Sequence, residues 1–324
     1  MRVRYAVFVL AAVLAAPAGA LAQGYKPSRT VELVVHTGPG GGSDVLARAL
    51  SVMAEREKLL PVRMVVVNKP GGGSTSAAAY VVSKKNDPHV IACFTNIWLI
   101  DPMVQEAATN KLVDMSPIAR LVVEPALVVV RADSQFKTLK EFIDAAKAKP
   151  GALKMSGGSI TSRENTVRQL LMQLTGARWV FISFPSGGER IAALLGGHVD
   201  MMIVDPSEAG EQVRAGKLRV IAQVNERRLP GFPDVPTIKE SGFDIPNVPQ
   251  MRGVVGAPGM STETIAFYED LFLKASKTAG WQKFVNDSQL DGEFVKAAEL
   301  KAFFAKFEGE LREILKAAGA KVVR

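Results

Sequence analysis

Short apolar segments alternate with amphipathic segments along most of the chain. Apolar runs of strand length lie at 31–36, 64–67, 90–94, 118–123, 127–130, 180–184, 199–204, 218–224 and 253–256. Helical patterns lie between many of them, at 44–56, 74–83, 139–148, 163–174, 189–195 and 207–215. Because buried parallel strands are apolar on both faces and are joined by helices, this alternation predicts parallel α/β sheets.

The C-terminal part of the chain has a different pattern and is predicted to be helical. From Leu300 to Ala318 apolar residues recur at intervals of three and four, so they fall on one stripe of a helix. Such a stripe either packs on the core of its own domain or binds a partner, and packing on the core is the commoner arrangement.

Two places along the chain are predicted to cross between domains. Near Glu124 an apolar run is broken by a proline and starts again, and a proline-rich polar stretch follows a later strand. Two crossings place one domain within the other, so residues 24–124 and 225–324 form a first domain that encloses a second domain of residues 125–224. The predicted fold class is α/β, with two Rossmann-like domains, two crossing segments and a ligand cleft that closes by hinge motion.

The first 22 residues have the pattern of a secretory signal peptide. Arg2 and Arg4 precede an apolar run at 5–16, and small residues end the segment at Ala20 and Ala22. The apolar run is shorter than the roughly 20 residues that span a membrane, so we expect cleavage after Ala22 and an exported protein. A lipid anchor needs a cysteine at the cleavage point, and the one cysteine, Cys93, is far from it, so we expect no lipid anchor.

The composition excludes several classes of site. The 324 residues include one cysteine, Cys93, which excludes a disulfide framework, Cys-rich zinc sites and Cys-x-x-Cys redox pairs. The three histidines are far apart and lack a zinc-binding spacing, so we expect no metal. The formal charge of +8 comes from 40 basic and 32 acidic residues without a basic block, and we therefore expect no nucleic-acid partner.

Four glycine-rich loops follow strands or open helices, at 37–44, 68–75, 155–162 and 184–189. Glycine lets the backbone approach a ligand closely, and the N-terminus of a helix presents unpaired N–H groups to an anion. A single loop of this kind is equally well explained by a tight turn, and its hydroxyl groups by helix capping. Four such loops, two from each predicted domain, favour an anion-binding cleft.

No enzyme motif accompanies these loops. The first loop departs from the dinucleotide-binding fingerprint because Ser43 stands where a glycine or alanine is required, and no acidic residue closes the second strand. The sequence has no phosphate loop ending in Gly-Lys-Ser/Thr, no Gly-x-Ser-x-Gly elbow and no recognisable Cys/His pair. A nucleotide-dependent enzyme that uses the first loop as a phosphate site remains an alternative, which the export signal disfavours.

Spaced motifs along the chain resemble one family of receptors. They are Pro-Gly-Gly-Gly-Ser-Asp at 39–44, Asn-Lys-Pro-Gly-Gly-Gly at 68–73, Ala-Leu-Leu-Gly-Gly-His-Val-Asp at 193–200, Arg-Leu-Pro-Gly-Phe-Pro-Asp-Val-Pro-Thr at 228–237 and Arg-Gly-Val-Val-Gly-Ala-Pro at 252–258. In this order they resemble the substrate-binding receptors of tripartite tricarboxylate transporters, the Bug family, from about residue 25 to residue 319.

The resemblance implies a two-lobed periplasmic binding protein, type II-like, that captures a carboxylated metabolite and delivers it to membrane permease subunits. Such a receptor is not an enzyme and needs no cofactor. Its ligand would be a di- or tricarboxylate, an amino acid or an aromatic acid, and we expect a monomer. A receptor that signals to a membrane kinase would share every site residue, so this alternative stays open.

The resemblance also implies which residues bind the ligand. One carboxylate is held by backbone N–H groups and hydroxyls at Gly41, Gly42, Ser43, Asp44, Gly72, Gly73, Ser74 and Thr75. The second domain closes with loops that include Ser156, Gly158, Ser159, Thr161, Ser162, Ser186 and Gly187. We expect Asp44 to orient its loop and cap the following helix, or to reach the ligand through water, because a direct contact would bring like charges together.

Further side chains are candidates that also have structural alternatives. Thr95 and Asn96 follow the third strand, at the edge where ligands of α/β proteins bind. Arg163 pairs either with a second ligand carboxylate or with a neighbour on an exposed helix face, and His36 lies either in the pocket or in the core. Phe94 and Trp98 face either an aromatic or aliphatic part of the ligand or the core, which is the commoner place, and Cys93 is expected to be buried. Lys69 and Arg190 are further basic candidates, for which a solvent-exposed face is the expected place.

Overall fold

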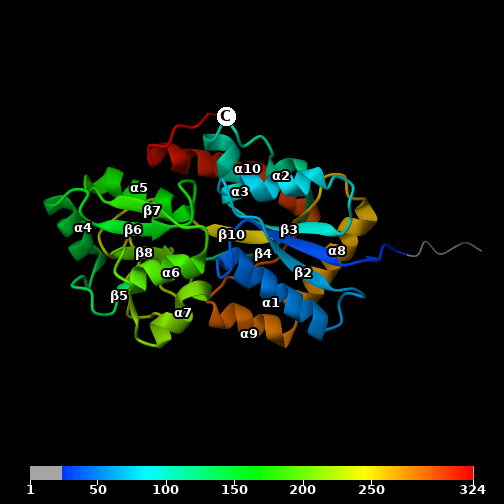
Figure 1. Cartoon of the computed structure of the whole chain (residues 1–324), viewed down its shortest axis with the longest axis horizontal. Helices are drawn as coiled ribbons and strands as arrows, with labels where there is room; N and C mark the ends of the chain where they lie inside the picture. The colour runs from blue at the N-terminus through cyan, green and yellow to red at the C-terminus, as the bar shows by residue number, and fades with distance from the viewer. Residues whose placement is uncertain (1–23, 324) are drawn as a thin grey trace, which may run out of the picture.

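The computed structural model describes residues 24–323, and the predicted signal peptide lies outside this range. The described chain forms two α/β lobes side by side, each built around its own sheet (Figure 1). None of the helices in the described range combines the length and the apolar character that a membrane crossing needs.

The first lobe contains a six-stranded sheet with the strand order β11-β4-β10-β3-β1-β2. The N-terminal part of the chain supplies β1 (Val31–Val35), α1 (Gly42–Arg56), β2 (Met64–Asn68), α2 (Thr75–Ser83), β3 (Val90–Thr95), α3 (Ile97–Val104), η1 (Leu112–Asp114) and β4 (Ser116–Glu124). After its passage through the second lobe, the chain adds β10 (Gln250–Gly256), α8 (Thr262–Ser276), α9 (Ala279–Asp287), β11 (Val295–Lys296) and α10 (Ala297–Ala317).

The second lobe contains a five-stranded sheet with the strand order β7-β6-β8-β5-β9. Its elements are β5 (Ala126–Arg131), α4 (Leu139–Ala148), β6 (Lys154–Gly157), α5 (Arg163–Thr175), β7 (Val180–Ser183), α6 (Gly187–Leu195), β8 (Met201–Val204), α7 (Pro206–Arg214) and β9 (Leu218–Val224). The glycine-rich loops before α1, α2, α5 and α6 all follow a strand, so two loops of each lobe lie at the ends of their sheet.

Both sheets are mixed, whereas the sequence predicted parallel ones. In the first lobe β1 is parallel to β2 and β3, but β10 is antiparallel to β3 and β4. In the second lobe β6 is parallel to β7 and β8, but β5 is antiparallel to β8 and β9. A strand that leads out of a lobe and a strand that leads back into it run in opposite directions. The two passages between the lobes therefore produce the antiparallel pairs β4–β10 and β5–β9.

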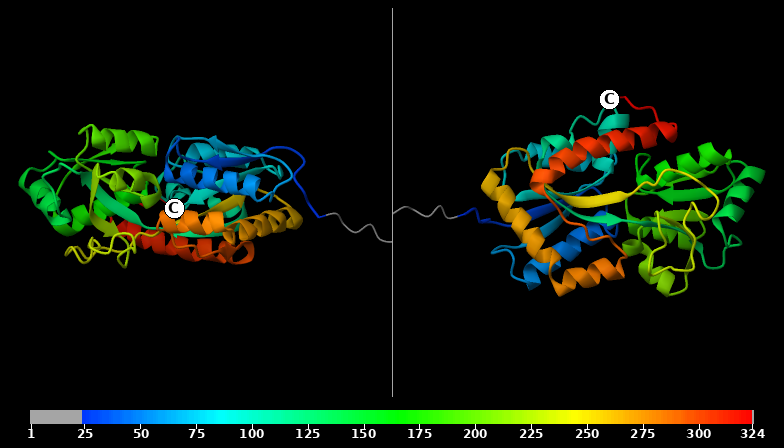
Figure 2. Two further views of the ribbon diagram at one scale, coloured as in Figure 1. Left: turned by 90° about the horizontal axis from the view of Figure 1, so that it is seen from below. Right: turned by 180° about the vertical axis from the view of Figure 1, so that it is seen from behind.

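The C-terminal helix α10 packs its apolar stripe on the first lobe, as predicted. The side chains buried in that lobe's core are Leu300, Phe304, Phe307, Leu311 and Leu315. Beyond the last turn Ala318 is buried in the core of the second lobe instead. Figure 2 shows this end of the helix beside the second lobe, so the C-terminal helix and the residue after it pack on both lobes, in addition to the two chain segments that connect them.

The segment between β9 and β10 stays with the second lobe over most of its length. Leu229, Ile238 and Val248 are buried against the cores of that lobe, and the backbone of Gln223 in β9 bonds to Pro236 and Ile238. The sequence assigned residues after 224 to the first lobe because the stretch is polar and rich in proline. We propose instead that the second lobe extends to about residue 248.

Candidate functional site

A cavity of about 270 Å³ lies between the two lobes, at the ends of both sheets. The first lobe contributes the loops after β1 and β2, the end of β3 and the start of β10. The second lobe contributes the loops after β6 and β7, together with side chains at the beginnings of α5, α6 and α7. The cavity is therefore built from the ends of strands and the starts of helices in both lobes.

The structure brings eight of the predicted site residues to the wall of this cavity. They are Gly42, Gly72, Gly73, Thr95, Gly158, Ser159, Ser162 and Arg163. The other ten lie outside the lining, and most of them position the loops: Gly41, Ser43, Asp44, Ser74, Thr75, Asn96, Ser156, Thr161, Ser186 and Gly187.

The first glycine loop is held by carboxylates of the protein. Asp44 accepts the backbone N–H of Gly40 at 3.0 Å and pairs with Arg48, so it orients the loop. No side chain caps α1, which begins after Gly41. The N–H of Gly42 instead donates to the carboxylate of Glu208 in α7, at 2.5 Å. The start of α1, where we expected a ligand carboxylate, thus carries a carboxylate from the second lobe.

The second glycine loop has a similar arrangement. Asp101 in α3 accepts from both the N–H and the hydroxyl of Ser74, each at 2.6 Å. Thr161 of the second lobe donates to the other oxygen of Asp101 at 2.5 Å. Burial raises the pKa of Asp101 above its ordinary value, although Ser74 and Thr161 oppose the shift. Asp101 therefore links the second loop of the first lobe to the third loop, in the second lobe.

The second-lobe loops differ from each other in how their helices begin. Ser186 caps α6 by accepting the N–H of Glu189 at 3.2 Å. Ser162 stands at the corresponding place before α5, but its buried hydroxyl has no hydrogen-bond partner among the described residues and faces the cavity. A Cβ at Gly187 would overlap the carbonyl oxygen of Gly40, so this glycine permits close contact between the lobes.

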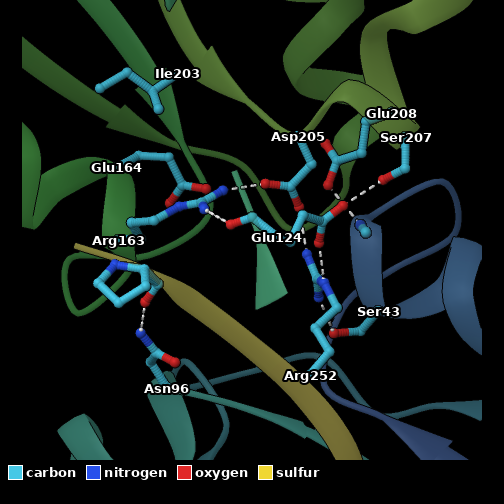
Figure 3. Close-up of polar contacts among 12 residues, drawn as sticks. Ser43, Asn96, Glu124, Arg163, Glu164, Ile203, Asp205, Ser207, Glu208 and Arg252 are labelled. Carbon is cyan, nitrogen blue, oxygen red and sulfur yellow. Dashed lines mark hydrogen bonds and ion pairs between the residues drawn. The ribbon is translucent and has the colours of Figure 1, made fainter. Parts of the chain in front are cut away.

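A network of buried ion pairs lies beside the cavity (Figure 3). Arg252 of β10 pairs with Glu124, the last residue of β4, and with Asp205 of the second lobe. The other oxygen of Asp205 pairs with Arg163, which also donates to the carbonyl of Glu124 at 2.7 Å. Arg163 is thus paired with neighbours and buried, not exposed. The network joins both lobes at the first crossing between them.

Burial governs the ionisation of these carboxyl groups. It raises the pKa of Glu124 to about 7 and that of Glu208 to about 8, against the opposing effects of Arg252 and Arg190. Burial acts on Asp205 in the same direction, but there Arg163 and Arg252 outweigh it and lower the pKa. Asp205 is therefore the carboxylate of the network that stays ionised at neutral pH.

His36 lies in the cavity wall and is neutral. Its Nδ1 accepts a hydrogen bond from Nε1 of Trp98 at 3.1 Å, which leaves the proton of the ring on Nε2. Burial and the nearby Arg252 lower the pKa of His36 to about 3. The imidazole therefore adds no charge to the cavity, and buried Trp98 supports it from behind.

The remaining candidates are distributed between core and surface. Phe94 is in the core, where its ring contacts Phe304, and Cys93 is buried with a pKa raised to about 12 by burial. Lys69 lies over the ring of Tyr80. Asn96 bonds the backbone of Pro249 and Met251, and so fixes the start of β10. Arg190 was expected on a solvated face, but it is buried and lines the cavity.

The sequence reasoning missed the acidic residues in and beside the cavity, a glutamine, and the arginine of β10. The missed residues are Glu124, Glu164, Asp205, Glu208, Gln250 and Arg252. A usable signal existed for three of them: Glu124 lies between two apolar runs, Asp205 directly follows an apolar strand, and Arg252 directly precedes one. An ionisable residue in an apolar run is buried, and a buried charge needs a partner. Among the described residues no group of three or more His, Cys, Asp or Glu side chains could hold a metal ion.

Comparison of the sequence with known families gives a consistent result. The model of the family described as "Tripartite tricarboxylate transporter family receptor" matches residues 47–319. A UPF0065 protein of Cupriavidus necator is 30% identical over 306 residues, which cover 94% of this chain and 92% of that protein.

Solved structures share the fold. The periplasmic binding protein BugD matches with a TM-score of 0.85 at 22% identity, over 91% of this chain and 99% of its own. MatC from Rhodopseudomonas palustris with bound malate gives 0.80 at 22% identity, over 89% and 99% of the two chains. A third protein, from R. palustris with adipate, gives 0.84 at 20% identity, over 91% and 98%. The described chain thus has the two-lobed α/β fold of periplasmic binding proteins.

Proposed function

The chain belongs to the tripartite tricarboxylate transporter receptor family, and from this premise we propose that it captures a carboxylate-bearing small molecule in the cavity between its lobes. In this proposal the receptor is exported, its signal peptide is removed after Ala22, and it acts as a monomer without catalysis. The closed receptor delivers its ligand to the membrane permease subunits of the transporter. Two similarly folded proteins with bound malate and adipate support a carboxylate as the ligand class.

The proposal rests on four buried hydrogen-bond donors in the cavity wall that have no acceptor in the protein. The hydroxyls of Thr37 and Ser162 and the Nε atoms of Arg163 and Arg190 are buried, and none has a hydrogen-bond partner among the described residues. A buried donor left unpaired costs about 1–3 kcal/mol. Four such donors from both lobes around one cavity favour a ligand with several acceptor oxygens, and a carboxylate has two.

The interlobe position of the cavity supports capture by closure. The N–H of Gly38 in the first loop donates to the carbonyl of Pro185 in the fourth at 2.9 Å, so the lobes touch at its edge. A ligand in the cavity contacts both lobes at once and therefore stabilises the closed arrangement over an open one. This coupling is what a receptor that presents its closed form to a permease requires.

A thermal-shift screen tests the proposal. The processed protein, purified from a periplasmic extract, is screened against mono-, di-, tri- and aromatic carboxylates, with NAD, NADP and ATP included. A ligand at 100 times its Kd stabilises the protein by about 2.7 kcal/mol, which raises Tm by several degrees. We expect a shift with one class of acid, and a shift with nucleotides alone would overturn the proposal. Mass measurement of the same sample tests cleavage after Ala22, and light scattering tests the monomer.

A further inference from the structure

One guanidinium in the cavity wall lies between two carboxylates. Arg190 of α6 is 3.6 Å from an oxygen of Glu164 in α5 and 3.6 Å from an oxygen of Glu208 in α7. Its Nη2 donates to the carbonyl oxygen of Ile203 at 2.6 Å. Arg190 therefore divides its charge between the two glutamates and is held in place by the end of β8.

Each of these glutamates keeps one oxygen without a donor. The Oε2 atoms of Glu164 and Glu208 are buried and accept no hydrogen bond from any described residue. The two side chains are only 8% and 3% exposed, and both residues line the cavity. Oε2 of Glu208 is the oxygen that lies 3.6 Å from Nη1 of Arg190, which is too long for a hydrogen bond. Buried carboxylate oxygens need donors, and a group in the cavity can supply them to both glutamates.

The charges in and beside the cavity do not balance. Three arginines, which stay protonated, contribute +3: Arg163, Arg190 and Arg252. Four carboxylates contribute −4 when all are ionised: Glu124, Glu164, Asp205 and Glu208. His36 is neutral and adds nothing. The charges that line the cavity balance, three against three, and Glu124, which pairs with Arg252 outside the lining, adds one more negative charge when it is ionised. With all four carboxylates ionised the cluster therefore has one negative charge in excess, and a ligand with only carboxylates would add to that excess.

Resting on the function proposed above, we infer that the ligand is an amine-bearing carboxylate, whose ammonium group binds to Glu164 and Glu208 on the cavity side of Arg190. The carboxylate of the ligand accepts hydrogen bonds from the unpaired donors of the cavity wall. Its ammonium group supplies a positive charge and donates to the Oε2 atoms of the two glutamates. An amino acid, or another zwitterion of that size, has both groups. A di- or tricarboxylate without an amine has carboxylates but no ammonium group.

The ligand-free protein balances the same charge with a proton. The pKa of Glu208 is raised to about 8 by burial and by the nearby Asp205 and Glu164, against Arg190 and Arg252. The N–H of Gly42 at the start of α1 also faces this carboxylate and opposes protonation. An ammonium that arrives beside Glu208 favours its ionised form, so the proton leaves. Binding of the amine-bearing ligand at pH 7 is therefore coupled to proton release.

Matched pairs of ligands that differ only in the amine test the inference. The pairs are aspartate and succinate, glutamate and glutarate, alanine and propionate, 4-aminobutyrate and butyrate, and phenylalanine and 3-phenylpropionate, measured by calorimetry at pH 7. We expect the amine member of at least one pair to bind tenfold or more tightly than its partner. Equal or tighter binding of the amine-free member overturns this inference and leaves the proposed function standing. Absence of binding by every pair overturns this inference, and the proposed function falls with it if the carboxylate screen described above also shows no shift.

Variants of the two glutamates separate the ammonium site from the rest of the cavity. Glu208→Gln and Glu164→Gln keep the shape of the side chain, and each should reduce the preference for the amine member by at least tenfold. Glu211→Gln, on an exposed part of α7, is the matched control and should leave the preference unchanged. Calorimetry in phosphate and in Tris buffer should show proton release by the wild type and less by Glu208→Gln. A preference that survives in both cavity variants contradicts the inference.

Discussion

The backbone N–H of Gly42 in the first lobe donates to the carboxylate of Glu208 in the second lobe. Gly42 begins α1, and the N-terminus of a helix favours negative charge through its unpaired N–H groups and its dipole. In this structure the second lobe itself supplies the acceptor, a carboxyl oxygen of Glu208. A ligand carboxylate can bind the N–H of Gly42 only by displacing Glu208, so the contact between the lobes and the binding of ligand compete for one donor.

The raised pKa of Glu208 predicts how stability depends on pH. In the folded protein this carboxyl keeps its proton up to about pH 8, whereas the ordinary value is 4.5. Between these values the folded state binds more protons than the unfolded state, so this contribution to stability is present at low pH and is lost as the pH rises through 8. We expect Tm of the ligand-free wild type to fall from pH 5.5 to pH 8.5.

The Glu208→Gln variant isolates this contribution. Its amide does not titrate, so its Tm should fall by several degrees less than that of the wild type over the same range. Glu211→Gln should behave as the wild type does, because Glu211 is exposed. Equal falls in the wild type and in Glu208→Gln, measured by circular dichroism, would show that Glu208 is ionised throughout.

Gly158 offers a steric test of the cavity that leaves the protein core intact. It lines the cavity, and a Cβ built on it meets no atom within 4 Å. Gly158→Val therefore fills ligand space without a clash, and we expect binding of the screened acid to weaken at least 100-fold. Gly42→Val is a poorer test, because its side chain would overlap Arg252 and Asp205 in the ion-pair network.

The control for this test is Gly309→Val. Gly309 is exposed on α10 and also has open space around it. Both variants should keep Tm within a few degrees of the wild type, since neither disturbs packing. Normal ligand affinity in Gly158→Val, measured by calorimetry, would mean that the ligand binds elsewhere.

Much of the fold could be predicted from local patterns. The strand at 218–224 and the helix at 139–148 have the bounds that the apolar periodicity gave. The antiparallel strands could not be predicted, because strand direction depends on how the chain passes between the lobes and not on the apolar run itself. Helix α3 was also missed, since Ile97–Val104 is apolar except for Asp101 and contains Pro102, and so lacks a helical stripe.

Only the backbone loops of the site could be predicted from the sequence. Glycine loops such as 68–75 stand out in the sequence because their function depends on local geometry. The partners of those loops do not stand out: Glu208 lies 166 positions from Gly42, and Asp101 lies 27 positions from Ser74. The carboxylates that occupy the helix starts are determined by tertiary contacts, and a single sequence carries no signal for such pairs.

Loss of Arg252 should destabilise the whole protein. In Arg252→Met the carboxylates of Glu124 and Asp205 lose a buried partner, and breaking a buried pair in this way costs about 3–5 kcal/mol. We expect a large fall in the free energy of unfolding, measured with urea at pH 7. A smaller fall is expected for Glu124→Gln/Arg252→Met, which removes one of the stranded charges. An Arg252→Met variant as stable as the wild type would show that the network is not held as described.

An exposed ion pair provides the comparison. Arg29 pairs with Asp87 at 2.6 Å, but its side chain is 56% exposed. Such pairs contribute about 0–1 kcal/mol, so Arg29→Met should leave the free energy of unfolding nearly unchanged. Because both substitutions remove one guanidinium, the contrast between the two arginines tests whether burial causes the difference in the free energy of unfolding.

Thr161 and Asp101 provide the last test, of closure itself. The hydroxyl of Thr161 in the second lobe donates to Asp101 in the first, and hydrogen bonds to a charged group contribute about 1.5–3 kcal/mol. Thr161→Val removes this bond, while Ser74 and Gln105 still donate to Asp101 and the first lobe keeps its fold. The closed form becomes less populated, and the apparent affinity for the screened acid should fall about tenfold or more. Small-angle scattering of the ligand-free variant should show a larger radius of gyration.

Thr175→Val, whose hydroxyl bonds within its own lobe, should change neither the radius of gyration nor the affinity. An unchanged radius and affinity in Thr161→Val would mean that this bond does not hold the lobes together.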